Sequence, residues 1–339
     1  MKIVAVMMMR NEADVIESWV RYYIGAVDHI IITDHLSVDG SGDLVRKLIA
    51  EGLPISLEIE NRPGYLQEER MKKMMLRAFF EFEADWVLLL DADEFLIPPA
   101  GRPLRYVFNE LRNDRPLKVA WTTYIPTESD PDEPNVLKRV THRLDHEVKQ
   151  VFKVMIPAKI GREPEAVIEM GSHNMRLGKR KVKLQDAPSG MSLAHFPVRS
   201  KEQIASKVMV GWLATLTRPE YCEGQCYHWK LLFDNFLNNE RGFSGDLGEI
   251  AFHYLGGTKE EKGFSKVVNG PIEGMLTDFA IRYPSDSTCN PLKLFAQTAE
   301  EIALKYGQLN ARVALMESSP KTSRRNLLAA LSGVLSGRK

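Results

Sequence analysis

Two aspartates separated by one residue, Asp91 and Asp93, follow a run of four apolar residues at positions 87–90. Such a run is typical of a buried central strand that ends where the acidic side chains begin. If the strand continues, both aspartates point to the same side, because successive side chains of a strand alternate. Paired carboxylates repel each other unless a cation or a shared proton compensates, and oxygen ligands suit Mg²⁺ or Mn²⁺. We therefore expect a metal-bound phosphate compound as the ligand.

An acidic pair after an apolar run can also be only a solvated turn, and the order of elements upstream helps to decide between these readings. Three strand and helix units precede the aspartates, with Asn11 as the expected N-cap of the first helix. The strands are predicted at 2–9, 28–33 and 55–59, and the helices at 12–23, 44–49 and 66–82. This alternation predicts an α/β fold with a mainly parallel sheet flanked by helices.

Polar residues stand just past the ends of three predicted strands. They are Asn11, Asp34 and Asp91. The carboxyl ends of parallel strands lie at one edge of a sheet, and ligands of open α/β sheets bind in the crevice outside that edge. The sequence therefore predicts that these side chains converge on one site.

Three segments at 9–12, 34–40 and 86–95 together resemble a known enzyme family. They read Met-Arg-Asn-Glu, Asp-His-Leu-Ser-Val-Asp-Gly and Trp-Val-Leu-Leu-Leu-Asp-Ala-Asp-Glu-Phe. They are similar to the (K/R)NE, D-x-x-S-x-DG and DADEF signatures of family-2-like glycosyltransferases of the GT-A fold. The resemblance is closest to the bacterial subgroup related to the family-92 glycosyltransferases. It covers residues 1–210, with the segments in the family's order and spacing.

The resemblance implies a metal-dependent, inverting, hexosyltransferase-like enzyme. It would move a sugar from a nucleoside diphosphate sugar, with UDP as the expected nucleotide, to a glycan or a lipid-linked acceptor. The divalent cation would be Mn²⁺ or Mg²⁺. The implied nucleotide-binding residues are Arg10, Asn11, Glu12, Asp34 and Asp91, with Asp34 placed at the base. Asp91 and Asp93 are the implied metal ligands, and Asp93 and Glu94 are the catalytic candidates, with the identity of the base left open. Since Glu94 alternates to the opposite side of a strand, a buried structural carboxylate is the alternative.

A histidine from a later strand is the third metal ligand that the resemblance implies. His195 is the first choice, because residues 193–200 resemble the subgroup's H-x-P-x-R-S segment, and His173 is the second. Either could instead be an ordinary core or surface histidine. Arg199 and Lys207 could pair with the diphosphate through charge-assisted hydrogen bonds, or face solvent.

Length and charge bound the remaining possibilities. The chain has 339 residues, of which 44% are hydrophobic, and its 45 basic and 45 acidic side chains balance. This balance gives no reason to expect nucleic acid as a partner. We expect a nucleotide-sugar-binding and catalytic GT-A domain at 1–205, followed by a helical C-terminal region at 206–339 that completes the acceptor side.

Three cysteines, an odd number in a chain of this length, favour a reducing compartment. Residues 1–9 are too short for a signal peptide, and no stretch reaches the roughly 18 apolar residues of a membrane span. We therefore expect a cytoplasmic protein, with the inner face of the cell membrane as a second location. Residues 321–339 predict a basic amphipathic helix that could contact an anionic membrane peripherally. Packing on its own domain or on a partner protein is the alternative for this helix.

Two other functional classes stay open. A magnesium-dependent phosphatase or phosphotransferase of the haloacid dehalogenase type also has two aspartates after an apolar strand, the first being the nucleophile. That motif usually follows the first strand and has Thr or Val at its fifth position, where this chain has Phe95. The other class is a non-catalytic nucleotide-sugar-binding protein, which would bind a donor without turning it over.

Overall fold

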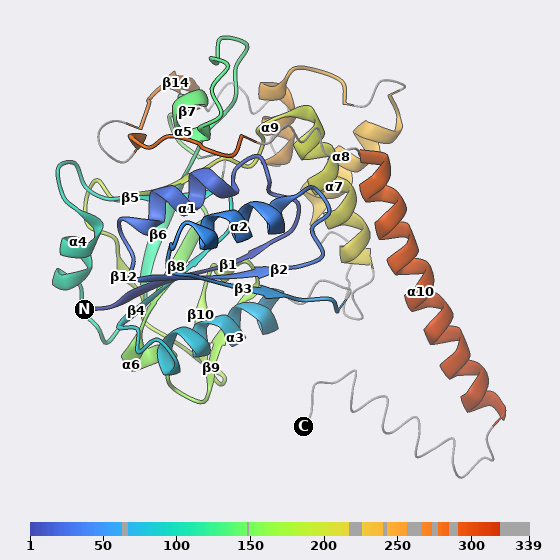
Figure 1. Cartoon of the computed structure of the whole chain (residues 1–339), viewed down its shortest axis with the longest axis horizontal. Coiled ribbons are helices and arrows are strands. Elements are labelled where there is room, and N and C mark those ends of the chain that lie inside the picture. The colour runs from blue at the N-terminus through green and yellow to red at the C-terminus, as the bar shows by residue number, and fades with distance from the viewer. Residues whose placement is uncertain are drawn as a thin grey trace.

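The computed structural model describes residues 1–62, 67–147, 149–216, 226–239, 243–255, 266–272, 277–284 and 291–318. Its centre is a nine-stranded sheet with helices on both faces (Figure 1). The first half of the chain alternates strands and helices as predicted. These elements are β1 (Ile3–Met9), α1 (Ile16–Ile24), β2 (His29–Asp34), α2 (Ser41–Ala50), β3 (Ile55–Ile59), α3 (Gln67–Phe80) and β4 (Trp86–Leu90).

The strand order of the main sheet is β3-β2-β1-β4-β8-β6-β13-β5, and β12 pairs with β6 off this path. Strands β1 to β4 are parallel to one another, whereas β8 and β5 run antiparallel to their neighbours. The later strands are β5 (Glu94–Ile97), β6 (Leu117–Thr123), β8 (Phe152–Pro157), β12 (Gln185–Asp186) and β13 (Ser192–His195). The predicted α/β class, with a mainly parallel sheet flanked by helices, is confirmed.

Two hydrophobic cores lie on the two faces of the sheet. Helices α1 and α2 cover one face and α3 covers the other (Figure 1). Alternate residues of β1 enter different cores, because Ile3 and Ala5 pack on the α1 side and Val4 and Val6 pack on the α3 side. A central strand buried on both faces must be apolar throughout, which explains the uninterrupted runs in β1 and β4.

Several short elements surround the sheet. Helix α4 (Leu104–Glu110) follows β5, and α6 (Ala158–Gly161) follows β8. A second, three-stranded sheet lies near α3, and a two-stranded sheet lies apart from it. These elements are α5 (Val136–Arg139), β7 (His142–Leu144), β9 (Ala166–Ile168), η1 (Met170–Ser172), β10 (Met175–Leu177), β11 (Arg180–Lys181) and β14 (Val267–Asn269).

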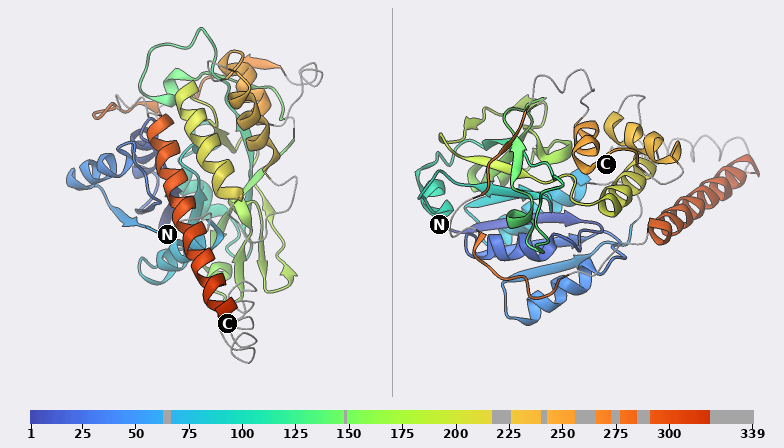
Figure 2. Two further views of the ribbon diagram at one scale, coloured as in Figure 1. Left: turned by 90° about the vertical axis from the view of Figure 1, so that its right-hand side faces the viewer. Right: turned by 90° about the horizontal axis from the view of Figure 1, so that it is seen from above.

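The chain after β13 is mainly helical, as predicted. It forms α7 (Lys201–Leu216), α8 (Tyr227–Leu237), α9 (Leu247–Tyr254) and α10 (Pro291–Ser318). Helix α10 packs beside α7 and its far end extends away from the rest of the structure (Figure 2). The predicted domain boundary between residues 205 and 206 falls inside α7, and the division into two domains stays a prediction.

Within the part of the chain that the structure describes, no helix is both long enough and apolar enough to cross a membrane. The predicted basic amphipathic helix at 321–339 lies outside the described residues.

Candidate active site

Asp91 and Asp93 lie in the turn between β4 and β5, so the expectation that they continue the strand is wrong. Strand β5 starts at Glu94 and runs antiparallel to β13, which requires the chain to leave β4 at Leu90. The turn separates the two carboxylates, and each has its own lysine. Lys153 Nζ donates to Asp91 Oδ2 at 2.5 Å, whereas Lys207 donates to Asp93.

Lys153 is a buried cation that sequence reasoning missed. It lies on β8, which is antiparallel to β4, and its side chain is 0% exposed. Its ammonium group also lies 3.0 Å from Glu94 Oε2. Burial opposes the charge on Lys153, but the two carboxylates outweigh burial and raise its pKa. A lysine inside an otherwise apolar strand was the available signal, because a buried lysine needs a partner.

Glu94 has partners for both of its carboxylate oxygens. Trp121 Nε1 donates to Oε1 at 2.9 Å, and the Asp91 backbone N–H donates to Oε2 at 2.8 Å. Burial raises the pKa of Glu94 to about 8, although Lys153 opposes this shift. The arrangement is that of a structural carboxylate joining β5, β6 and β8. A role for Glu94 as the base stays a prediction.

Asp93 is 2% exposed and faces several cations. Burial opposes its ionisation, but Lys207 and Arg199 hold the pKa of Asp93 below its ordinary value. Lys207 comes from α7, so the helical C-terminal part contributes directly to this site.

Arg199 ties the loop after β1 to the segment before α7. Its guanidinium donates to both carboxylate oxygens of Asp14, at 2.7 and 2.9 Å, and to Glu12 Oε2 at 2.5 Å. Burial raises the pKa of Glu12 to about 7, with Arg199 acting in the opposite direction. The side chain of Arg199 is 0% exposed. Arg199 therefore neither faces solvent nor has a free fork for a diphosphate, the two possibilities considered from the sequence.

His195 lies beside Asp93, with 3.8 Å between His195 Nε2 and Asp93 Oδ2. Its ring stacks on Trp121 at a centroid distance of 4.0 Å, and its buried Nδ1 has no hydrogen-bond partner among the described residues. Burial lowers the pKa of His195 to about 3, so the imidazole is neutral. His173 contacts the same tryptophan edge-on at 5.5 Å, and its Nδ1 lies 2.8 Å from the carbonyl oxygen of Phe152. The structure thus brings both candidate histidines to one indole.

Asn11 does not cap α1, because the helix starts at Ile16 with Val15 as its N-cap. Asn11 instead adopts a left-handed backbone with φ 59°, a conformation that asparagine tolerates better than most residues. Its Oδ1 accepts from the Val38 N–H at 2.9 Å, and its own N–H donates to Ser37 Oγ at 3.0 Å. Asn11 therefore joins the loop after β1 to the loop after β2.

Asp34 also shapes the loop after β2. Its Oδ1 accepts from the Ser37 N–H at 3.0 Å. Its Oδ2 lies so near Gly42 that a Cβ there would be 2.6 Å away, which explains the glycine in the first turn of α2. Burial raises the pKa of Asp34. Arg10 pairs with Glu301 of α10 at 3.1 Å. Nucleotide binding by Arg10, Asn11, Glu12, Asp34 and Asp91 stays a prediction.

The strand order places these loops at a topological switch point. Strand β1 has β2 on one side and β4 on the other, with Met9 paired to Asp34 and Met7 paired to Leu90. The carboxyl ends of β1, β2 and β4 consequently lie side by side. A crevice outside such a reversal of strand order is the usual ligand position in open α/β sheets.

The donor set suits a divalent cation in its chemistry. The ion pairs of this site join five carboxylates (Glu12, Asp14, Asp91, Asp93 and Glu94) to three cations (Lys153, Arg199 and Lys207). Because burial raises the pKa of Glu12 to about 7 and that of Glu94 to about 8, the charges of the site nearly balance at neutral pH. Oxygen donors and a neutral imidazole without a hydrogen bond are the ligands that Mn²⁺ accepts. Among the described residues, however, no three His, Cys, Asp or Glu side chains converge closely enough to hold a metal. A cation held by Asp91, Asp93 and His195 together therefore requires the turn at 91–93 to bring the two carboxylates closer, and Lys207 to move away from Asp93.

No protein-family model matches the sequence, and no curated protein matches it. Solved structures of low similarity do match. Glucosyl-3-phosphoglycerate synthase from Mycobacterium tuberculosis, in complex with Mn²⁺, UDP and phosphoglyceric acid, is 23% identical over 35% of this chain, with a TM-score of 0.26. The match spans only 43% of the synthase chain.

Two further solved structures match a larger part of their own length. The mannosyltransferase PcManGT from Pyrobaculum calidifontis, in complex with GDP-Man and Mn²⁺, is 13% identical, with 100% of this chain and 88% of that chain covered and a TM-score of 0.37. HddC from Yersinia pseudotuberculosis is 12% identical, with 57% and 93% covered and a TM-score of 0.34. All three TM-scores lie below 0.5, so the function of this chain is inferred from its own residues.

Proposed function

We propose that this chain is a GT-A glycosyltransferase that moves a sugar from a nucleoside diphosphate sugar, with UDP as the expected nucleotide, to a glycan or a lipid-linked acceptor. Residues 1–205 would bind the donor, and the helical part from 206 on would complete the acceptor side, with α7 shared between them. Mn²⁺ or Mg²⁺ would be the cofactor, and inversion at the sugar carbon is the expected outcome.

The observation that carries the proposal is the acidic pair at the switch point of the sheet. Asp91 and Asp93 follow β4, directly beside the strand whose loop carries Arg10 and Asn11. Nucleotides bind at such a reversal of strand order because the loops on either side diverge and leave a crevice.

Each residue of the site would have a definite task in this proposal. Asp91 is 35% exposed at its side chain, with Lys153 on its Oδ2 and a long contact of 3.5 Å from Gln67 Nε2 to its Oδ1, so Oδ1 would be the oxygen that binds the ribose or the cation. Asp93 and His195 would hold the cation, which would stabilise the charge that develops on the leaving diphosphate. Lys207 would pass from Asp93 to the diphosphate. Glu94 would keep Asp91 and Trp121 in position.

The proposal is tested by incubating the protein with UDP-, GDP- and dTDP-sugars, with and without Mn²⁺, and measuring released nucleotide together with the melting temperature. A preferred donor should raise the melting temperature, because it binds only the native state. Asp91→Asn and Asp93→Asn should remove Mn²⁺-dependent donor hydrolysis while the fold persists. Full hydrolysis by either variant would argue against the metal role.

A second function is favoured by the lysine pairs. If Lys153 and Lys207 keep both carboxylates in the presence of Mn²⁺, the chain is a nucleotide-sugar-binding protein without turnover. Donor-dependent stabilisation without any nucleotide release would support this second function. The phosphatase alternative is less consistent with the order of the elements. Three strand and helix units precede β4, and Phe95 stands where that class usually has Thr or Val.

A further inference from the structure

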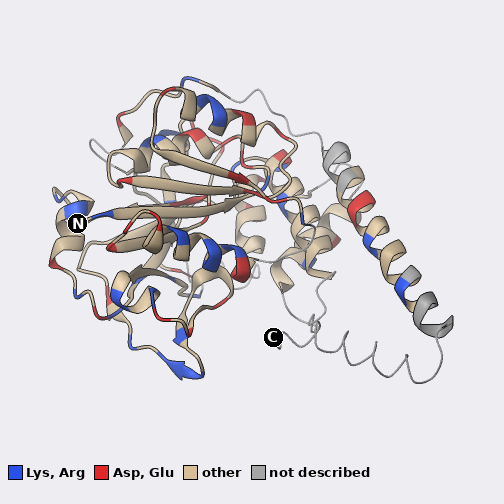
Figure 3. Cartoon of the chain, turned by 60° about the horizontal axis from the view of Figure 1, so that its bottom comes forward, with Lys and Arg blue, Asp and Glu red and all other residues tan. Residues whose placement is uncertain are grey.

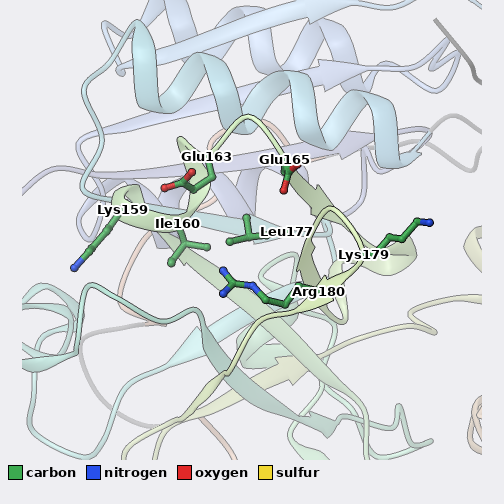
Figure 4. A pocket seen from close by; sticks show the side chains of 7 residues that line it. All are labelled: Lys159, Ile160, Glu163, Glu165, Leu177, Lys179 and Arg180. Carbon is green, nitrogen blue, oxygen red and sulfur yellow. The ribbon is translucent and has the colours of Figure 1, made fainter.

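A cavity of about 560 Å³ lies far from the candidate active site. Its walls come from α6 and the β10–β11 hairpin (Figure 4). Strand β8 leads into α6, and its last residue, Pro157, pairs with Trp86, the first residue of β4. Since Asp91 follows the other end of β4, the cavity lies at the opposite edge of the sheet. A ligand in this cavity would leave the nucleotide crevice free.

The segment that forms the cavity is basic, although the whole chain has no net charge. The cavity itself is lined by three basic and two acidic side chains. Residues 159–183 contain seven basic and three acidic side chains. The basic residues are Lys159, Arg162, Arg176, Lys179, Arg180, Lys181 and Lys183. In Figure 3 the hairpin projects from the lower edge of the body as a blue segment.

These cations differ from two exposed arginines elsewhere on the chain. Arg62 pairs with two glutamates and Arg112 pairs with Asp114. In contrast, none of the seven basic residues makes an ion pair with a described residue within 4 Å, even though Glu163 and Glu165 line the same cavity. A basic surface whose charges are not neutralised by internal ion pairs attracts external anions.

The cavity is also preorganised. The Gly178 N–H donates to the Glu165 carbonyl at 2.9 Å, and Arg176 donates to the Gly178 carbonyl at 2.6 Å. Gly178 has φ +55°, and a Cβ there would lie 3.1 Å from a Glu165 oxygen, so the hairpin turn is held against the rim. This fixed turn positions the neighbouring Arg180 over the cavity.

The side chains in the cavity indicate what it would bind. The guanidinium of Arg180 points toward the apolar floor formed by Ile160 and Leu177, while Lys159 and Lys179 extend outward on either side (Figure 4). A guanidinium binds phosphate oxygens in a bidentate manner, and flanking lysines add charge without fixed geometry. An apolar floor beside a cation suits a ligand with both a phosphate and an apolar part.

We propose that this cavity binds the phosphate of an anionic ligand. The source would be either an anionic phospholipid headgroup at a membrane surface or a soluble phosphate compound. The exposed position of the hairpin at the edge of the body allows either source to reach Arg180.

Two probes distinguish the sources. Full-length protein is mixed with phosphatidylcholine vesicles with and without phosphatidylglycerol, and separately titrated with inorganic phosphate in metal-free buffer. The test variant is Lys179→Glu/Arg180→Glu. The matched control, Lys138→Glu/Lys201→Glu, changes the charge equally at two exposed lysines on other elements. Arg180→Gln is a milder variant that removes only the guanidinium, and melting temperatures confirm that all variants fold.

The lipid source is established if the wild type binds anionic vesicles, the test variant binds them about tenfold or more weakly, and the control binds them as the wild type does. The soluble source is established if the wild type binds inorganic phosphate but not the vesicles, and the test variant loses that phosphate binding while the control keeps it. The proposal is overturned if wild-type protein binds neither probe. It is equally overturned if the control loses as much binding as the test variant.

Discussion

The replacement Lys153→Met should be among the most destabilising single changes near the site. Methionine keeps most of the side-chain volume but removes an ammonium group that lies 2.5 Å from Asp91 and 3.0 Å from Glu94. Lys153 and Glu94 are both 0% exposed, so Asp91 would lose its cation and Glu94 its buried partner. Breaking a buried pair by removing one partner typically costs about 3–5 kcal/mol, and we expect a loss of unfolding free energy in this range.

The assay is urea unfolding at neutral pH, followed by tryptophan fluorescence, for wild type, Lys153→Met, Glu94→Gln and the double variant. If the two charges compensate each other, the double variant should be more stable than the sum of the single losses predicts, by about 2 kcal/mol. A loss below about 1 kcal/mol for Lys153→Met would refute the reasoning, since it falls well short of the cost of an unpaired buried charge. A coupling energy near zero would refute it too.

Three further predictions follow from particular contacts. Asn11→Ala should lower the unfolding free energy by about 2 kcal/mol, and Asn11→Gly by about half of that. Both variants lose the hydrogen bond between the loops, but only alanine is strained at φ 59°. Equal losses of unfolding free energy in urea would contradict this. Arg199→Lys should lower the melting temperature by several degrees, because lysine cannot replace the two-point contact with Asp14, and an unchanged melting temperature would count against that contact. Burial lowers the pKa of His35 to about 4, so the folded protein favours the neutral imidazole. The unfolding free energy should therefore be highest above pH 6.5 and fall by up to about 3 kcal/mol as the pH drops toward 4. His35→Gln should flatten that part of the pH–stability curve, and an unchanged curve would contradict the assignment.

Local patterns were sufficient to predict the sheet and its helices. Strand β3 was predicted at its observed bounds, and β1, β2 and β4 to within one or two residues, because continuous apolar runs and helical stripes are local signals. The neighbouring positions of the β1, β2 and β4 ends followed from the rules for parallel βαβ units.

The ionic partners within the site were not predictable from the sequence. Lys153 stands 62 positions after Asp91, and Lys207 stands 114 positions after Asp93. Only the antiparallel insertion of β8 beside β4 and the return of α7 over the strand ends bring them together. The assignment of Asn11 as a helix cap was wrong for a similar reason, since its partner Val38 lies on another loop.

In the proposed function a nucleoside diphosphate and a divalent cation bind together at Asp91 and Asp93. Calorimetric titration tests this directly for wild type, Asp91→Asn and Asp93→Asn with UDP and with GDP, each with and without Mn²⁺. We expect wild type to bind one nucleotide tightly only when Mn²⁺ is present, and both variants to lose that dependence. Binding of equal affinity with and without Mn²⁺, unchanged in the two variants, would contradict the claim.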